Sequence, residues 1–335
     1  MARLDPRLRY IPRPPIPPPS TSSLPSLPRI ALPACLLGGI LLPAQAAIAA
    51  PMPLRGAPVV AAVAKKGPKK GTLYGGGQIG RRFRQGRHDD VQFVSLGVTR
   101  DGKRAKAFVD FNTTCPGADR ILPGSVMEEL ELDPRGGLFA SGPYREAGPN
   151  GSQEGTFRFA GRFVSPDTAR GTARLQMTVR FADGRPDLAC DSGTVSWEVR
   201  NPNASGQEGE VEGGAAYFGS SSDSFPFLLR VAGSGRQVAK AALEYNLRCK
   251  NTTGGFFRSE VMPPARIRRD TFTGGQAFDF ALTPELTAKA VSSVKGRFGK
   301  SRVTGAWRVR ATIVNREGDP VDECDSGRMT WQATR

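Results

Sequence analysis

Hydrophobic and polar residues alternate strictly along several stretches of the chain. Between residues 172 and 181, one set of alternate positions is apolar: Ala173, Leu175, Met177, Val179 and Phe181. The positions between them are polar or charged: Thr172, Arg174, Gln176, Thr178 and Arg180. Because successive side chains of a strand point to opposite faces, this period of two predicts a strand with one buried and one solvated face.

The C-terminal part of the chain has the same alternation. Its apolar set is Trp307, Val309, Ala311 and Ile313, and the polar residues between them are Arg308, Arg310 and Thr312. Asp101-Gly102 and Ser234-Gly235 lie between strand-like runs and predict hairpin turns. The only segment that favours a helix is 283–294, which we expect to form a short helix inserted between strands.

Several of these features recur at a fixed distance of 134 residues. The tetrapeptide Cys190-Asp191-Ser192-Gly193 recurs at 324–327, and Trp197 recurs as Trp331. Such coincidence at one offset indicates a tandem duplication. We therefore predict an all-β protein with two homologous antiparallel β-sandwich domains, a small barrel being the alternative architecture. The expected boundaries are 71–200 for the first domain, 201–209 for a linker and 210–335 for the second domain.

The cysteines follow the same spacing. Cys115 and Cys190 are 75 residues apart, and so are Cys249 and Cys324. Four cysteines allow three pairings, and the duplication selects Cys115–Cys190 and Cys249–Cys324, because each copy should carry its own bridge. Closing a loop of this length stabilises each domain by roughly 4.5 kcal/mol in the chain-entropy model. A zinc site is disfavoured because the close Cys-x-x-Cys spacing of such sites is missing.

These motifs support a resemblance that covers roughly residues 71–335. A Tyr-Gly-Gly or Tyr-Phe-Gly triplet (Tyr74, Tyr217) stands near the start of each repeat, a cysteine lies in the middle, and a Cys-x-Ser-Gly motif followed by tryptophan lies at the end. This arrangement resembles the repeats of secreted actinobacterial proteins of unknown function. The resemblance implies no chemistry, and no catalytic residue is transferred from it.

The N-terminal residues 1–50 are typical of a signal peptide region. Arg29 precedes an apolar run from Ile30 to Leu42, and 13 residues are too few to span a bilayer comfortably. Ala-x-Ala cleavage is expected after Ala46, Ala49 or Ala50. A membrane anchor and a lipoprotein site at Cys35 are the alternatives, the latter opposed by Pro33. We therefore expect a secreted or cell-surface protein with no transmembrane segment after cleavage.

Charge is concentrated between this leader and the first domain. The chain has 47 Lys and Arg against 31 Asp and Glu, a formal net charge of +16. Residues 51–88 contain no acid and are expected to form a flexible basic arm. Its candidate polyanion-binding residues are Lys65, Lys66, Lys69, Lys70, Arg81, Arg82, Arg84 and Arg87. A solvated linker without a ligand is the alternative interpretation of this segment.

Few residues are candidates for catalysis. Ser192 and Ser326 would need a general base, and the single histidine, His88, lies in the basic arm. We therefore expect the Cys-Asp-Ser-Gly motif to form a turn. Trp197 and Trp331 are of the type that stacks on sugars, but their alternation with apolar residues places them in the core.

An acidic cluster near the middle of the first repeat offers a further candidate. Its members are Glu128, Glu129, Glu131 and Asp133. Paired carboxylates serve glycosidases and calcium sites, but nothing in the sequence fixes their separation, and we expect a solvated loop. A second acidic group is expected to form a turn: Asp319, Asp322, Glu323 and Asp325.

The leading hypothesis is a secreted, non-enzymatic binding or adhesion module for anionic cell-envelope or matrix polymers, which it would hold through the basic arm and the surface of the second repeat. Residues 209–335 contain 19 Lys and Arg against 13 Asp and Glu. The alternatives are a structural module that binds an extracellular protein and a carbohydrate-active hydrolase that uses Glu128 or Glu129. We expect no catalytic residue, no cofactor and no metal. Specific nucleic-acid binding is not expected, because Tyr74 and Phe83 are the only aromatic residues near the basic arm.

Overall fold

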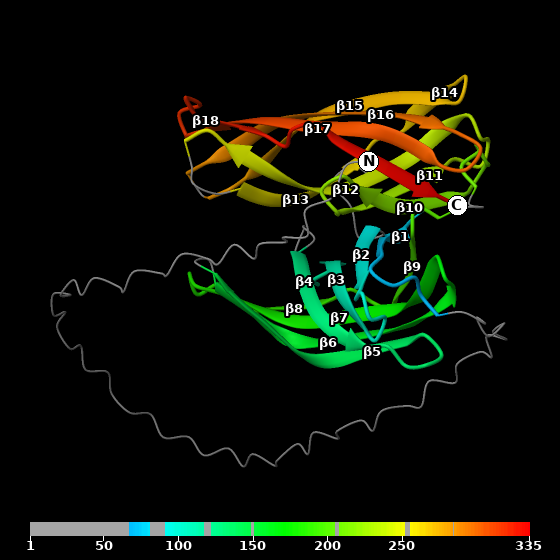
Figure 1. Ribbon diagram of the computed structural model, residues 1–335. Helices are drawn as coiled ribbons and strands as arrows, with labels where there is room; N and C mark the ends of the chain where they lie inside the picture. The colour runs from blue at the N-terminus through cyan, green and yellow to red at the C-terminus, as the bar shows by residue number, and fades with distance from the viewer. Residues whose placement is uncertain are drawn as a thin grey trace, which may run out of the picture. The chain divides into compact units, whose positions relative to one another are not determined.

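A computed structural model describes residues 67–80, 91–116, 122–148, 151–204, 208–251, 255–283 and 285–335. All regular elements in these ranges are β-strands, and they form two antiparallel sheets (Figure 1). The expected all-β class is therefore confirmed. The predicted signal peptide, most of the basic arm and His88 lie outside the described residues.

The first sheet is a path of eight strands with β8 attached to β7, in the order β4-β3-β2-β1-β9-β7-β6-β5. Hydrogen bonds join only antiparallel neighbours, so hairpins account for most of the topology. The strands are β1 (Leu73–Ile79), β2 (Val91–Val98), β3 (Arg104–Thr113), β4 (Leu122–Glu131), β5 (Gly137–Gly148), β6 (Gly151–Ser165), β7 (Thr168–Phe181), β8 (Leu188–Asp191) and β9 (Val195–Arg200).

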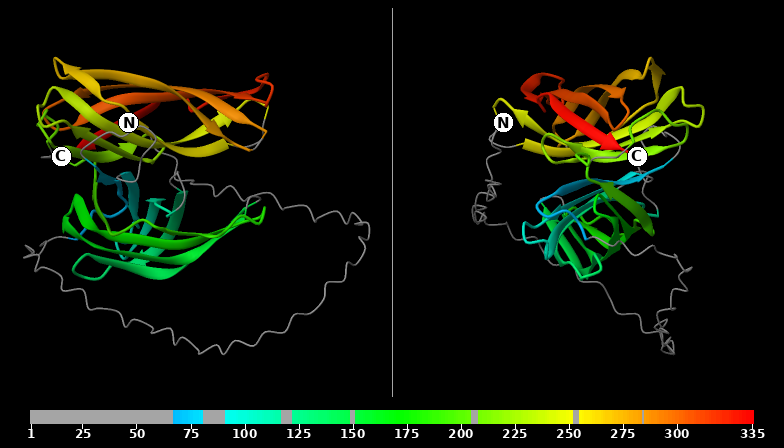
Figure 2. Two further views of the ribbon diagram at one scale, coloured as in Figure 1. Left: turned by 180° about the vertical axis from the view of Figure 1, so that it is seen from behind. Right: turned by 45° about the vertical axis from the view of Figure 1, so that its right-hand side comes forward.

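The second sheet has the order β11-β10-β19-β17-β16-β15-β14-β12-β13, and β11 also pairs with β12. This pairing closes the path on itself, so the second sheet approaches a barrel (Figure 2). Its strands are β10 (Ala216–Ser221), β11 (Pro226–Val231), β12 (Gln237–Cys249), β13 (Gly255–Met262), β14 (Ala265–Arg268), β15 (Thr271–Ala281), β16 (Thr287–Phe298), β17 (Val303–Val314), β18 (Pro320–Asp325) and β19 (Met329–Thr334).

The expected helix at 283–294 is wrong, because strand β16 begins at Thr287 and pairs with β15 and β17 along its length. The bounds expected for the basic arm, 51–88, and for the first domain, 71–200, overlap. Within this overlap Leu73–Ile79 forms strand β1 between β2 and β9. In β1, Tyr74 is fully buried, so core packing holds this part of the basic segment in place.

Each sheet encloses its own apolar core, and a tryptophan lies in each. Trp197 stacks on Phe159 with 4.8 Å between the ring centroids, and Trp331 stacks on Phe227 at 3.9 Å. Both tryptophans are at most 3% exposed, as the alternation predicted. Their rings lie against paired glycines, Gly161 with Gly171 and Gly296 with Gly305. A Cβ atom at any of these glycines would overlap the tryptophan ring.

One disulfide lies in each half of the chain, Cys115–Cys190 and Cys249–Cys324, which confirms the predicted pairing. In the first half Cys115 follows Thr114, which forms an isolated backbone bridge with Asp191 of β8, and the disulfide joins it to Cys190 of β8. In the second half the disulfide joins Cys249 and Cys324, which lie opposite each other in the paired strands β12 and β18. The two cysteines of each bond are 75 residues apart. Each disulfide therefore closes a long loop within one sheet.

A third, smaller apolar cluster contains residues of both sheets. Its buried members are Ile79, Val91, Phe93, Phe218, Leu228, Ala242 and Val261. At its margin Asp110 of β3 interacts with Glu244 of β12, and both carboxyl groups are buried. Burial and mutual repulsion raise the pKa of Glu244 well above its ordinary value, and burial raises the pKa of Asp110 to about 6. The contact between the sheets therefore contains a pair of carboxyl groups that favours at least one bound proton.

Candidate anion-binding face

The outer side of strand β16 is basic. Along Thr287–Phe298, inward positions such as Ala290 and Val294 are buried, and the residues between them are exposed. The exposed set is Lys289, Val291, Ser293, Lys295 and Arg297. Because strand residues two apart are separated by about 6.7 Å, the cations from Lys289 to Arg297 extend over about 27 Å.

The neighbouring strand β17 adds two arginines to the same side. Arg308 lies opposite Ser293 of β16, and Arg310 lies opposite Val291. Paired residues of neighbouring strands share a face of the sheet, so these arginines project beside the β16 cations. We call the cations of this surface and its borders the basic face: Arg248, Lys250, Lys289, Lys295, Arg297, Arg308, Arg310 and Arg328.

Two hollows lie along the basic face. The first, with a volume of about 660 Å³, lies over Gly296 and Gly305, and we call it the glycine hollow. Its charged lining residues are Lys295, Arg297 and Arg328, and it has no acidic lining residue. Seven serine and threonine residues also line it: Ser220, Ser221, Ser222, Thr271, Thr273, Thr304 and Thr330.

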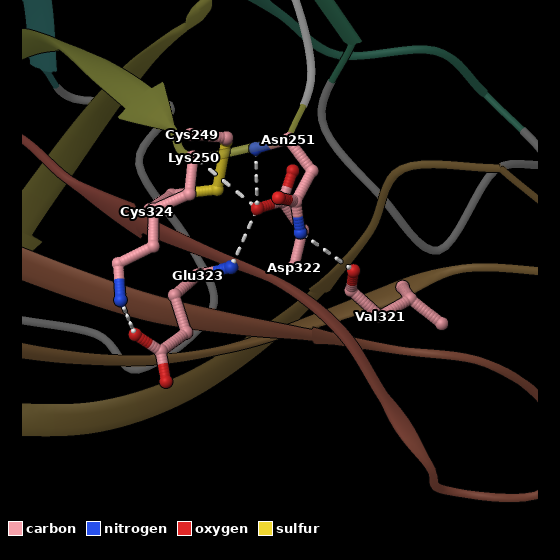
Figure 3. Close-up of a disulfide and its surroundings, with 7 residues drawn as sticks. All are labelled: Cys249, Lys250, Asn251, Val321, Asp322, Glu323 and Cys324. Atoms are coloured by element: carbon pink, nitrogen blue, oxygen red, sulfur yellow. Dashed lines mark hydrogen bonds and ion pairs between the residues drawn. A yellow bond between two sulfur atoms is a disulfide. The ribbon is translucent and has the colours of Figure 1, made fainter.

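The second hollow, of about 920 Å³, lies beside the Cys249–Cys324 bond, and we call it the disulfide hollow. Five cations line it: Arg248, Lys250, Lys289, Arg308 and Arg310. Its acids are Glu323 and Asp325. Figure 3 shows the disulfide with Lys250 directed to Glu323 at 2.6 Å between Nζ and Oε2. Next to it, Asp322 accepts the backbone N–H groups of Lys250 and Asn251 at 3.1 Å, which fixes this edge of the hollow.

Both acids of the disulfide hollow are neutralised within it. The Arg308 guanidinium donates to both carboxylate oxygens of Asp325, and Arg310 lies 3.6 Å from the same carboxylate. The Arg308 hydrogen bond lowers the pKa of Asp325, so this carboxylate stays ionised and holds Arg308 in place. Among the described residues, five cations of the basic face form no ion pair: Arg248, Lys289, Lys295, Arg297 and Arg328. The face therefore has an excess of positive charge available to an external anion.

The corresponding side of the first sheet is different. Gly161 and Gly171 pair in the first sheet as Gly296 and Gly305 do in the second, which aligns the two registers. In this alignment Glu154 replaces Lys289, Ala160 replaces Lys295 and Gln176 replaces Arg310. The paired arginine is present in both, since Arg174 contacts Asp191 as Arg308 contacts Asp325. Arg162 occupies the place of Arg297 in the first sheet, so the cations of β16 and β17 that are specific to the second sheet are Lys289, Lys295 and Arg310.

The predicted polyanion-binding residues of the arm are mostly outside the described residues. Lys65, Lys66, Arg81, Arg82, Arg84 and Arg87 have no described position. Lys69 is described, and its ammonium group lies 2.8 Å from the carboxylate of Asp167. Lys70 is exposed. The structure therefore places part of the predicted set against the first sheet rather than in a free arm.

The Cys-Asp-Ser-Gly motifs form turns, as expected. The Ser326 hydroxyl accepts the backbone N–H of Val309 and donates to the carbonyl of Gly327, both at 2.9 Å. Gly327 has a φ of 70°, and its N–H donates to Asp325. Ser192 makes the equivalent bonds with Leu175 and Gly193. The serine hydroxyls thus connect these turns to the adjacent strand of the sheet, β7 for Ser192 and β17 for Ser326.

The acidic cluster of the first sheet lies on a strand, so the expected loop is wrong for most of it. Glu128 and Glu129 are consecutive residues of β4 and project to opposite faces. Glu129 pairs with Arg104, and Asp133 accepts the backbone N–H groups of Arg135 and Gly137. The two glutamates therefore do not form the facing pair that a glycosidase uses. In the second acidic group, Asp322, Glu323 and Asp325 lie on β18 rather than in a turn.

Sequence reasoning missed the cations of β16. The sequence contains a pattern that indicates them, since Lys289, Lys295 and Arg297 are separated from one another by odd numbers of residues and alternate with residues that are buried in the strand. The helical interpretation of 283–294 concealed the alternation at Lys289, because it ended the expected helix just before Lys295 and Arg297 and so separated the three cations. Arg308 and Arg310 were placed on the solvated face of their strand, but their neighbours were not known.

No protein-family model matches the chain, and no curated protein matches it. Two solved structures were matched: a candidate outer membrane protein from Bacteroides fragilis and a candidate AttH protein from Nitrosomonas europaea. The first is 11% identical with a TM-score of 0.20, and the match covers 78% of this chain and 96% of the other. The second is 8% identical with a TM-score of 0.19, covering 78% and 91%. At such TM-scores neither likeness carries an argument about this protein.

The described residues contain no helix long and apolar enough to cross a membrane. Among the same residues, no group of three or more His, Cys, Asp or Glu side chains is arranged to hold a metal ion.

Proposed function

We propose that this protein is a secreted binding module that holds anionic polymers of the cell envelope or extracellular matrix on the basic face. The observation that carries the proposal is the group of five cations that form no ion pair with any described residue, around two hollows of one sheet. One of them, Lys289, lies opposite Asp279 of β15 in the register. The five cations surround an acid-free hollow of about 660 Å³ and a larger one of about 920 Å³. A polymer with repeated negative charges complements this surface better than a single small anion does.

The physical basis is the sum of many weak contacts. An exposed ion pair contributes little alone, typically below about 1 kcal/mol. A polymer that meets several cations in sequence gains each contact at a high effective concentration once the first has formed. The resulting affinity depends strongly on salt, because exposed charges are screened within about 10 Å at 0.1 M ionic strength.

The disulfides support the proposed location. Such bonds persist in oxidising environments, which include the extracellular space and the periplasm. The predicted leader at residues 1–50 agrees with export, and anionic polymers are abundant partners outside the cytoplasm. Secretion and the signal peptide are parts of the proposal.

The arm residues Lys65, Lys66, Arg81, Arg82, Arg84 and Arg87 are proposed as a second contact to the same polymer. Deleting residues 65–87 is a poor test of them, because it removes β1 between two other strands of the first sheet. Replacing the six cations by serine or glutamine keeps β1 and removes only charge. We expect these replacements to weaken retention on a polyanion, in addition to the effect of the basic face.

The basic face is tested by retention of the purified protein on dextran sulfate resin in a salt gradient. The variant Lys289→Glu with Arg310→Gln introduces the residues that the first sheet has at these positions. We expect elution at clearly lower salt and at least a tenfold loss of affinity at 0.1 M salt. The control Lys103→Glu with Lys106→Gln changes the net charge equally on exposed residues of the first sheet. Equal losses in both variants would contradict a localised binding face.

A further inference from the structure

The glycine hollow is built from two rows of side chains that run across four strands. One row is Thr271, Arg297, Thr304 and Gln332, and the next is Thr273, Lys295, Ala306 and Thr330. In the first row Arg297 lies between Thr271 and Thr304. In the second row Lys295 lies beside Thr273, and Thr330 follows after Ala306. Strands lie about 4.8 Å apart, so each cation has hydroxyl groups within reach of the same ligand unit.

Several of these hydroxyl groups are available to a ligand. Thr273, Thr304 and Thr330 are exposed, and within the described ranges their side chains make no hydrogen bond. Thr271 donates to the carbonyl of Arg268 at 2.7 Å, which leaves its oxygen free to accept. A hydroxyl group both donates and accepts, so this surface matches ligand hydroxyl groups as well as anionic oxygens.

The hollow offers no exposed aromatic surface. Phe272 and Trp331 line it from the core side and are 2% and 3% exposed. Trp331 is held beneath Gly296 and Gly305, in contact with Phe227. Proteins that bind single-stranded nucleic acid combine cations with exposed aromatic rings on which bases stack. The glycine hollow has cations but no exposed aromatic ring among its lining residues.

We infer that the glycine hollow recognises a hydroxyl-bearing anionic polymer, that is, a carboxylated or sulfated glycan, in preference to nucleic acid or polyphosphate. This inference rests on the proposed anion-binding function and specifies the ligand class of the same face. Lys295 and Arg297 bind the anionic groups, and the threonines bind sugar hydroxyl groups beside them.

The first sheet has two rows of side chains that align with the rows of the glycine hollow. Its aligned rows are Gly137, Arg162, Arg170 and Glu198, followed by Phe139, Ala160, Thr172 and Ser196. Ala160 stands in the place of Lys295, and Phe139, 66% exposed, stands in the place of Thr273. Glu198 pairs with Arg170 and Arg200 there. The aligned rows of the first sheet therefore keep one cation that forms no ion pair with a described residue, Arg162, and lack a counterpart of Lys295. They have two hydroxyl-bearing residues, Thr172 and Ser196, where the glycine hollow has four threonines.

The test measures binding of the full-length protein to four probes at one salt concentration. Polygalacturonate and dextran sulfate carry hydroxyl groups with carboxylates or sulfates, whereas polyphosphate and oligo-dT carry charge without a hydroxylated backbone. The variant Thr273→Val with Thr304→Val keeps shape and charge and removes two hydroxyl groups. The control Thr156→Val with Thr172→Val makes the same change at exposed strand positions of the first sheet.

We expect the unmodified protein to prefer at least one glycan over polyphosphate and oligo-dT. The Thr273/Thr304 variant should lose about tenfold in glycan affinity, as two hydrogen bonds would, with unchanged polyphosphate affinity. Equal affinity for all four probes, or no effect of this variant on glycan binding, would overturn the inference and leave the proposed function standing. Binding to none of the probes would overturn both.

Discussion

At the scale of single residues, the clearest result concerns the serines of the Cys-Asp-Ser-Gly motifs. Ser326 and Ser192 look like nucleophiles in the sequence, but each hydroxyl bonds to the backbone of a neighbouring strand and of the following glycine. The role that the structure gives them is to close a turn beside a disulfide.

Replacement of Ser326 by alanine is expected to destabilise the protein by about 1–2 kcal/mol. The backbone N–H of Val309, a buried residue, then lacks its acceptor, and an unsatisfied buried donor costs about this much. Denaturant unfolding of Ser326→Ala and Ser192→Ala measures the change, and both should lose similar stability. Unchanged stability in both variants would contradict the structural role.

At the scale of secondary-structure elements, alternation of apolar and polar residues was the most informative signal. It predicted the buried and solvated faces of β7 and β17, and the duplicated cysteines predicted both disulfides. It failed at β16, where the small residues Ala288, Ala290 and Ser292 give a weak apolar signal that suits a helix as well. The strand forms because β15 and β17 pair with it, and that tertiary context is not visible locally.

The candidate site was less predictable than the fold. Lys295 and Thr273 are close because β15 pairs with β16, and Thr330 joins them through β17 and β19. These residues are 22 to 57 positions apart in the chain, and only the register of four strands brings them together. The sequence predicted a binding surface on the second repeat without indicating which of its residues lie together.

The paired glycines of each sheet provide a test at this scale. A Cβ atom at Gly305 would overlap the Trp331 ring and the Lys295 carbonyl, so Gly305→Ala should destabilise the protein by about 2 kcal/mol. Gly97 of β2 has no atom within 4 Å of the equivalent position and serves as the control. Thermal unfolding should show a lower midpoint for Gly305→Ala than for Gly97→Ala. Equal midpoints would contradict the claim that close packing of the Trp331 ring excludes a Cβ atom at Gly305.

At the scale of the whole molecule, the contact that includes both sheets contains the carboxyl pair of Asp110 and Glu244. These residues are separated by 134 positions, the same offset that relates the repeated motifs. The Ser125 hydroxyl donates to Asp110 at 2.9 Å, and no cation contributes to the pKa shift of either carboxyl group. Burial therefore raises the pKa of both carboxyl groups in the folded protein without a cation to oppose it.

This pair predicts that stability falls as the pH rises. The pKa of Asp110 is about 6 in the folded protein against an ordinary value of 3.8, so its contribution is present at pH 4 and lost above pH 6. Asp110→Asn carries no charge and keeps an acceptor for Ser125. We expect the variant to gain about 2–3 kcal/mol relative to the unmodified protein on going from pH 4 to pH 7. Parallel pH profiles in urea unfolding would contradict this account of the contact.

The central claim, that anionic polymers bind the basic face, is tested most directly by lysine acetylation of the unmodified protein with and without dextran sulfate. Mass spectrometry measures the modification rate of each lysine. We predict that the polymer slows acetylation of Lys289 and Lys295 severalfold, while the exposed Lys103 and Lys106 of the first sheet react at unchanged rates. Equal protection of all four lysines, or protection of neither Lys289 nor Lys295, would contradict the claim.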